Sequence, residues 1–215
     1  MVKLVSLIIL VVASICIFVA DYMDNKKLRY FSKPLLMPAL AVFYFYSSPE
    51  LVPDIYVIIA LFFAFIGDIA LMWPHKKTFF MIGLTSFLLC HVVYIYIFLQ
   101  SVDFLSGNYI LLLIFIPFAI LGYLIYRKLS QYLGDMKLPV IIYMTIIMLM
   151  SFLSITRVCC FSGYNLFLPI LGSLFFIISD TILAFYEFKS KFPKGGVYYM
   201  STYILAQLLI VLGLL

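Results

Sequence analysis

Residues 54–73 read DIYVIIALFFAFIGDIALMW, an almost unbroken apolar run with a single acid, Asp68, well inside it. A helix needs about 20 apolar residues to cross a bilayer, within a range of roughly 17–25. Seven further stretches of this kind occur, so we predict an all-α bundle of eight transmembrane helices, a single transmembrane domain over residues 1–215. The predicted spans cover approximately residues 4–20, 33–47, 54–73, 78–99, 108–126, 138–156, 164–186 and 197–215.

The composition of the whole chain agrees with this membrane interpretation. Hydrophobic residues make up 67% of the 215 residues, charged residues only 11%, and the mean hydropathy is +1.21. Soluble domains are about 45–50% apolar and about 25% charged. A water-soluble globule of this composition would lack the polar surface to cover itself. The sequence therefore excludes a soluble enzyme, a disordered chain and a nucleic-acid-binding protein.

The positive charges indicate an orientation in the membrane. Of the 14 Lys and Arg residues, 12 fall in the first, third, fifth and seventh connections between the spans. Because cytoplasmic loops carry the excess of Lys and Arg, the odd-numbered loops are expected in the cytoplasm and both termini on the opposite side. The first stretch lacks a small-residue cleavage pattern and is interpreted as a retained span. Sparse Ala with abundant Ile, Phe and Lys favours a bacterial inner membrane, and the endoplasmic reticulum is the alternative location.

Two spans carry a matching local pattern around an acid. Residues 63–71 and 175–183 each contain a small residue, then Asp, then Leu three positions on, and the acids are Asp68 and Asp180. Asp68 lies eight residues before Lys76 and Asp180 lies nine before Lys189. At about 1.5 Å per helical residue the two acids have a similar depth. Four spans separate them, so their helices run in the same direction, which favours a duplicated four-helix unit.

An acid inside a membrane span needs a reason to be there. An ionisable side chain at the bilayer centre costs about 2.5–3.5 kcal/mol on insertion scales. If Asp68 and Asp180 converge, one carboxyl can act as a protonated general acid while the other stays an ionised base. The alternative is that each Asp pairs with a neighbouring basic residue or completes a local polar contact.

Other polar side chains in the apolar runs are candidate ligand-binding residues. His91 follows Gly83 and Phe87 at four-residue spacing, so the three share a helix face, and His91 can bind a ligand, orient a carboxylate or make only a buried hydrogen bond. Lys33 opens the second predicted span, where it either extends to the interface or meets a lipid phosphate. The remaining candidates for substrate binding are Tyr94, Tyr143, Ser179, Tyr199, Tyr203 and Gln207.

Several kinds of active site have no counterpart in the sequence. It contains no G-x-S-x-G pattern of a serine hydrolase and no H-E-x-x-H pattern of a zinc enzyme. Two histidines in the whole chain are too few for a His-rich metal site, and no glycine loop for phosphate is present. We therefore expect neither a metal nor a cofactor.

Five short motifs, in this order and span placement, resemble the YhhN-like lysoplasmalogenase family. They cover the second to the eighth span and read Lys33-Pro34-Leu35, Gly67-Asp68-x-x-Leu71-Met72, Gly83-x-x-x-Phe87-x-x-x-His91-x-x-Tyr94, Ser179-Asp180-x-x-Leu183-Ala184 and Ala206-Gln207-x-Leu209-Ile210. Relatives are eight-span membrane hydrolases that cleave the vinyl ether bond of lysoplasmalogens. The resemblance implies a lysophospholipid substrate and products that are a fatty aldehyde and a glycerophospho-ethanolamine or glycerophospho-choline.

The chemistry of vinyl ether cleavage matches the pair of acids. Protonation of the β-carbon leaves an oxocarbenium ion, and water then attacks the α-carbon. This reaction requires a buried acid and a carboxylate that stabilises positive charge and activates water. Asp68 and Asp180 are together sufficient, although the sequence does not say which of them takes which role.

Two other functions also use paired intramembrane acids. An intramembrane aspartyl protease would carry G-x-G-D, whereas this chain has Phe65-Ile66-Gly67-Asp68, and its Pro38-Ala39-Leu40 lies in the second span, before both acids. A proton-coupled transporter would account for the two acids and for an internal repeat. Uptake of a substrate into liposomes would distinguish the transporter from the hydrolase.

Overall fold

The computed structural model describes residues 1–49, 54–74, 76–100, 113–159 and 161–215, and within these ranges it contains eight α-helices and no strand. The predicted all-helical class is confirmed for this part of the chain. Residues 108–112 of the fifth predicted span lie outside the described residues. The helices are α1 (Val2–Tyr22), α2 (Lys26–Ser47), α3 (Ile55–Ala70), α4 (Lys77–Leu99), α6 (Phe115–Leu129), α7 (Lys137–Thr156), α8 (Tyr164–Ala184) and α9 (Gly195–Leu212).

Five of the helices, namely α1, α4, α7, α8 and α9, are long and apolar enough to cross a membrane, judged by length and composition. The helix α3 is apolar but shorter, with 16 residues. A short π-helical turn, Phe185–Lys189, continues α8. Eight membrane crossings therefore stay a prediction from the sequence.

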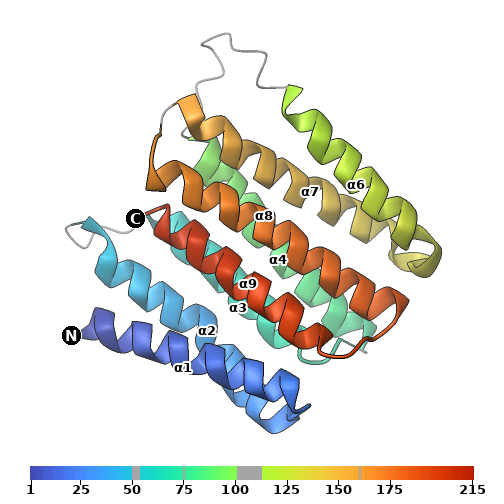
Figure 1. Cartoon of the computed structure of the whole chain (residues 1–215), viewed down its shortest axis with the longest axis horizontal. Coiled ribbons are helices and arrows are strands. Elements are labelled where there is room, and N and C mark those ends of the chain that lie inside the picture. Colours follow the sequence, from blue (N-terminus) through green and yellow to red (C-terminus); the bar gives the residue numbers. More distant parts are fainter. Residues whose placement is uncertain (50–53, 75, 101–112, 160) are drawn as a thin grey trace.

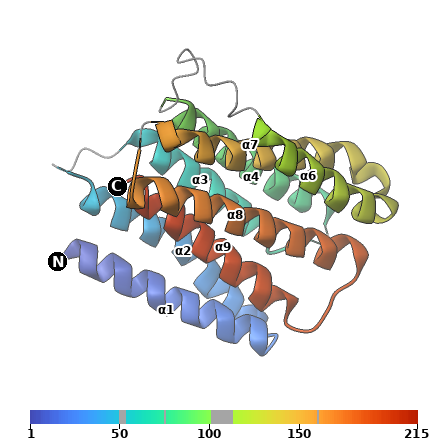
Figure 2. The same ribbon diagram turned by 45° about the horizontal axis from the view of Figure 1, so that its top comes forward.

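The helices run back and forth along one common direction. The pair α1 and α2 forms one flank of the bundle and α6 lies at the other (Figure 1). Both termini lie at the same end, and the connections after α1, α3, α6 and α8 lie at the opposite end (Figures 1 and 2). Most of the Lys and Arg residues lie in these four connections or in the helix turns beside them, so we call this end of the molecule the basic end.

Two glycines allow α3 and α4 to pack closely where the site lies. A Cβ atom on Gly67 would lie 2.6 Å from the ring of Phe87, and one on Gly83 would lie 2.6 Å from Leu71. Since these distances are shorter than any real carbon contact, each position admits only glycine without a shift of the neighbour. The close packing fixes Asp68, which follows Gly67 on α3.

The helix α2 begins seven residues earlier than the predicted span at residue 33. Asn25 caps it, because its side chain accepts a hydrogen bond from the backbone N–H of Leu28. Pro34 and Pro38 consequently lie inside the helix, where each removes one backbone donor. Lys33 thus falls within α2, where it is buried at 5% exposure.

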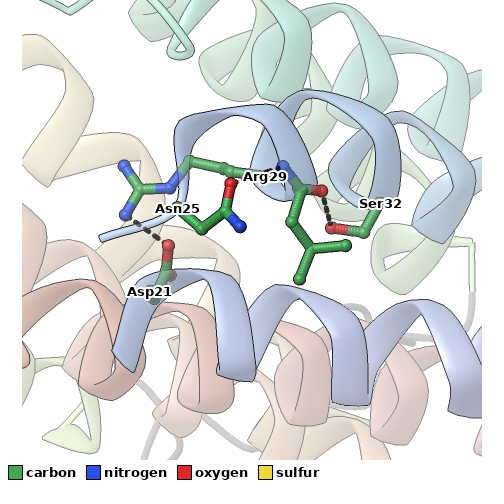
Figure 3. Close-up of polar contacts among 5 residues, drawn as sticks. Asp21, Asn25, Arg29 and Ser32 are labelled. Atoms are coloured by element: carbon green, nitrogen blue, oxygen red, sulfur yellow. Dashed lines mark hydrogen bonds and ion pairs between the residues drawn. The ribbon is translucent and has the colours of Figure 1, made fainter. Parts of the chain in front are cut away.

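An ion pair at the basic end connects α1 to its neighbours. Asp21, near the end of α1, is buried and pairs with Arg29 of α2 (Figure 3). A Cβ atom on Gly196 of α9 would lie 3.0 Å from the Asp21 carboxyl carbon. Close by, the Lys194 ammonium lies 4.2 Å from the centre of the Tyr22 ring. The first turn of α9 is thereby packed onto both α1 and α2.

Candidate active site

Two cavities meet at Asp180. The first, which we call the polar cavity, lies between α2, α3, α8 and α9, and Lys33, Asp68, Asp180 and Tyr203 face it; the space open to the centre of a water molecule is about 30 Å³. The second, the apolar cavity, lies between α4, α6, α7 and α8, and the corresponding space is about 70 Å³. Four residues line both cavities, namely Leu71, Phe87, Asp180 and Leu183. The two predicted acids are therefore brought to one site.

Asp68 is held by two partners, a lysine and a tyrosine. Its Oδ1 lies 3.4 Å from the Lys33 ammonium nitrogen, and its Oδ2 accepts a hydrogen bond of 2.8 Å from the Tyr203 hydroxyl. The ion pair is buried, with side-chain exposures of 6% for Lys33 and 2% for Asp68. The buried ion pair and the further hydrogen bond together hold the Asp68 carboxyl in place.

Asp180 has a different environment. It is half-buried, because it faces both cavities, and one of its oxygens accepts a hydrogen bond from the Tyr143 hydroxyl. Among the described residues no Lys, Arg or His nitrogen lies within 4.0 Å of its carboxyl oxygens. Of the two predicted acids, only Asp68 has a cation within 4.0 Å among the described residues. Such a difference in surroundings is typical of an acid and a base that divide the roles of catalysis.

Aromatic rings link the tyrosines that hold the two acids. The ring of Phe176 lies 5.7 Å from Tyr203 and 4.7 Å from His91, and His91 lies 5.3 Å from Tyr143, all edge to face. His91 is fully buried, and its ring nitrogens make no hydrogen bond within the described part of the chain. The structure therefore places His91 behind Tyr143, where it packs against the hydroxyl-bearing ring rather than against an acid.

The other predicted residues fall into two groups. Ser179 and Tyr199 line the polar cavity, and the Ser179 hydroxyl donates a hydrogen bond of 2.9 Å to the Tyr199 carbonyl, between α8 and α9. Tyr94 and Gln207 instead bond to each other, with 2.7 Å between the Tyr94 hydroxyl and the Gln207 amide oxygen. Both of these are fully buried and belong to neither of the two cavities.

The Tyr94–Gln207 hydrogen bond makes a prediction about stability. We expect Tyr94→Phe to lower the free energy of unfolding by about 1–3 kcal/mol, because the buried Gln207 oxygen loses its partner. Unfolding in mixed micelles measures this change. Tyr96→Phe is the matched control. Tyr96 also lies on α4, but its hydroxyl makes a solvent-exposed hydrogen bond of 3.4 Å to the Tyr56 hydroxyl. An unchanged stability of Tyr94→Phe would instead leave Tyr94 available as a ligand-binding residue.

The sequence did not single out one charged residue of the site. Glu187 lines the polar cavity from the π-helical turn that follows α8. The sequence could have indicated this residue, because Glu187 is an acid directly before a connection with three lysines. Apolar wall residues such as Ile147 and Ile177 gave no signal, since every span is rich in the same side chains.

Comparisons with known proteins show the family of the chain. The model of the YhhN family matches residues 28–214. The chain is also 30% identical over 207 residues to the human protein Lysoplasmalogenase TMEM86B, an alignment that covers 95% of this chain and 84% of the human one. No solved structure matches the chain. The family match spans α2 to α9, and with them both acids and both cavities, and on this ground the chain belongs to the YhhN family.

Proposed function

We propose that the protein is a lysoplasmalogenase-like membrane hydrolase that cleaves the vinyl ether bond of a lysoplasmalogen. The products are a fatty aldehyde and a glycerophospho-ethanolamine or glycerophospho-choline. The observation that carries the proposal is the junction of a polar and an apolar cavity at Asp180, with Asp68 facing the polar one. The name of the human relative gives independent support for this substrate.

A single-chain lipid has an apolar chain and a polar headgroup, and these match the apolar cavity and the polar cavity in polarity. The alkenyl chain lies in the apolar cavity, whose polar side chains are Tyr143, Asp180 and Thr181. The glycerophospho group lies in the polar cavity, within reach of the Lys33 ammonium. The vinyl ether, which joins the two parts of the lipid, then lies beside Asp180. Holding the bond next to the acid supplies the orientation that the reaction requires.

The first half of the reaction uses both acids. Asp180, which has no cation beside it, donates a proton to the β-carbon, and the electron pair of the double bond forms the new C–H bond. The oxocarbenium ion that results is stabilised by the Asp68 carboxylate, whose charge Lys33 balances in the resting state. Water then attacks the α-carbon and gives a proton to Asp68, which leaves a hemiacetal.

The second half restores both acids. Asp68 returns its proton to the glycerol oxygen as the bond between that oxygen and the α-carbon breaks. Asp180 takes the proton of the hemiacetal hydroxyl, and the aldehyde C=O bond forms. The net change is the addition of one water molecule, and no covalent bond to the protein forms at any step.

We also propose the membrane arrangement that the sequence predicts. The chain crosses the membrane eight times as one domain, residues 1–215, with the basic end in the cytoplasm and both termini on the opposite side. This orientation follows the excess of Lys and Arg in the odd-numbered loops. Both acids lie in the half of the bundle nearest the basic end, so the lysolipid enters from the inner leaflet of a bacterial inner membrane.

Aldehyde release by the purified protein in detergent tests the function. Three single-chain lipids with the same headgroup are compared: a vinyl ether, a saturated ether and an acyl ester. We expect aldehyde from the vinyl ether alone, since the saturated ether has no double bond to protonate. Free fatty acid from the ester would point to a lysophospholipase. A folded protein that releases no aldehyde but takes up lipid into liposomes would support the transporter instead.

A further inference from the structure

A groove lies between α6 and α7, outside the site described above, and the space in it open to the centre of a water molecule is about 320 Å³. Aromatic rings and small residues of α6 form one wall, and residues of α7 form the other. The helix α6 packs chiefly against α7 at the edge of the bundle (Figure 1), and its neighbouring residues Ile120 and Leu124 are 53% and 46% exposed. In a membrane this groove opens toward the lipid.

Two methionines lie between the groove and the apolar cavity. Met144 and Met148, one turn apart on α7, line both the groove and the cavity. Methionine side chains are unbranched and have three rotatable bonds, so they change shape more readily than the Leu and Ile side chains around them. Two adjustable side chains therefore separate the lipid-facing groove from the wall that carries Asp180.

Gly122 of α6 leaves space next to this partition. A Cβ atom on Gly122 would lie 3.5 Å from the Cγ of Met148, an ordinary contact distance. At Gly67 and Gly83 the corresponding distance is 2.6 Å, and there glycine is required for helix packing. Close approach of the helices therefore does not explain Gly122; its effect is that α6 has no side chain beside Met148 at this position.

We propose that the groove between α6 and α7 is a lateral passage for the hydrocarbon chain, with Met144 and Met148 as its movable partition. The lysolipid chain enters the apolar cavity through it, and the fatty aldehyde leaves by the same way. This inference rests on the proposed function, because cleavage separates an apolar product from a charged one. The groove gives the aldehyde an exit into the bilayer, while the glycerophospho group leaves through the polar cavity.

Filling the groove tests the passage. We expect Gly122→Leu to lower kcat/KM for a long-chain lysoplasmalogen about tenfold, by overpacking against Met148. A water-soluble vinyl ether with a chain of only a few carbons does not need the passage, so its kcat/KM should stay near that of the wild type. Adding Met148→Ala to Gly122→Leu should restore the long-chain rate. Leu121→Phe, which adds bulk on the lipid face of α6, is the control and should change neither rate.

Two results would overturn the passage. One is an equal loss for the long and the short substrate; the other is a Gly122→Leu variant that cleaves the long chain at the rate of the wild type. If wild type releases no aldehyde from any vinyl ether, the proposed function fails, and labelling then decides the passage alone. The probe is an acyl lysophosphatidylethanolamine with a diazirine at the end of its chain, reconstituted with wild-type protein in nanodiscs.

The labelling result separates a passage from ordinary contact with lipid. We expect the lysolipid probe to label Phe118, which is buried and lines the groove but not the apolar cavity, as well as Met144 and Met148, and unlabelled lysoplasmalogen to compete with it. A diacyl lipid with the same diazirine should label exposed residues of α6, such as Ile120, without reaching the two methionines. Lysolipid labelling confined to Ile120 and other exposed positions would show that the chain does not enter by this route.

Discussion

The Asp180→Asn variant is expected to lose aldehyde release by about 10²–10⁴-fold, the usual contribution of a general acid. Asparagine has the same shape and can still accept the hydrogen bond from Tyr143, but it has no proton acidic enough for the β-carbon. Because no ion pair of Asp180 is lost, the free energy of unfolding should stay close to that of wild type. Steady-state aldehyde release and unfolding in mixed micelles measure the two quantities.

The same substitution at an exposed acid provides the control. Asp135, whose side chain is 89% exposed in a pair with Lys77, can be changed to Asn without touching either cavity. Asp135→Asn should behave as wild type in both measurements. An Asp180→Asn protein that is folded and releases aldehyde at the normal rate would remove Asp180 from the reaction and leave the proton donor to be found elsewhere.

The Asp68→Asn variant should have both a lower rate of aldehyde release and a lower stability. The rate should fall about 10²–10³-fold, as it does when one group that stabilises transition-state charge is removed. The free energy of unfolding should also fall, by about 3–5 kcal/mol, because Lys33 is left as a buried cation without its partner. The contrast between the two Asn variants in stability is therefore part of the prediction.

The double variant Lys33→Met with Asp68→Asn separates the two effects. It removes both buried charges together, so most of the lost stability should return while aldehyde release stays low. Recovery of activity along with stability would mean that Asp68 serves only to neutralise Lys33. An Asp68→Asn protein that is as stable as wild type would contradict the importance of the ion pair for folding.

The depth and direction of the two acids were accessible from the sequence. Asp68 and Asp180 lie at nearly the same distance from a lysine-rich connection, on helices that run the same way, and the structure brings both to one cavity. Their partners were not accessible. Tyr143 and Tyr203 stood out only as polar residues in apolar spans, and which acid each one holds depends on how α7, α8 and α9 pack. The duplicated four-helix unit stays a prediction.

The cavities and the groove could not be predicted, for a reason specific to membranes. In a soluble helix the buried face is apolar and the outer face polar, so the pattern reveals the core. Here lipid covers the outer face, and side chains that face lipid, such as Ile120, are of the same type as those that line a cavity, such as Ile125. The sequence alone therefore does not distinguish Gly122 and Met148 from other residues of the spans.

The ion pair between Asp21 and Arg29 has a consequence for how this protein evolves. Arg29 lies inside the region that the family model matches, whereas Asp21 lies before it, on α1. A mutation of either residue alone leaves a buried or partly buried charge unpaired next to the first turn of α9. The two positions are therefore expected to vary together among relatives. A lineage should lose one charge with little penalty only when it also loses the other, so the first helix is expected to change in step with the family region.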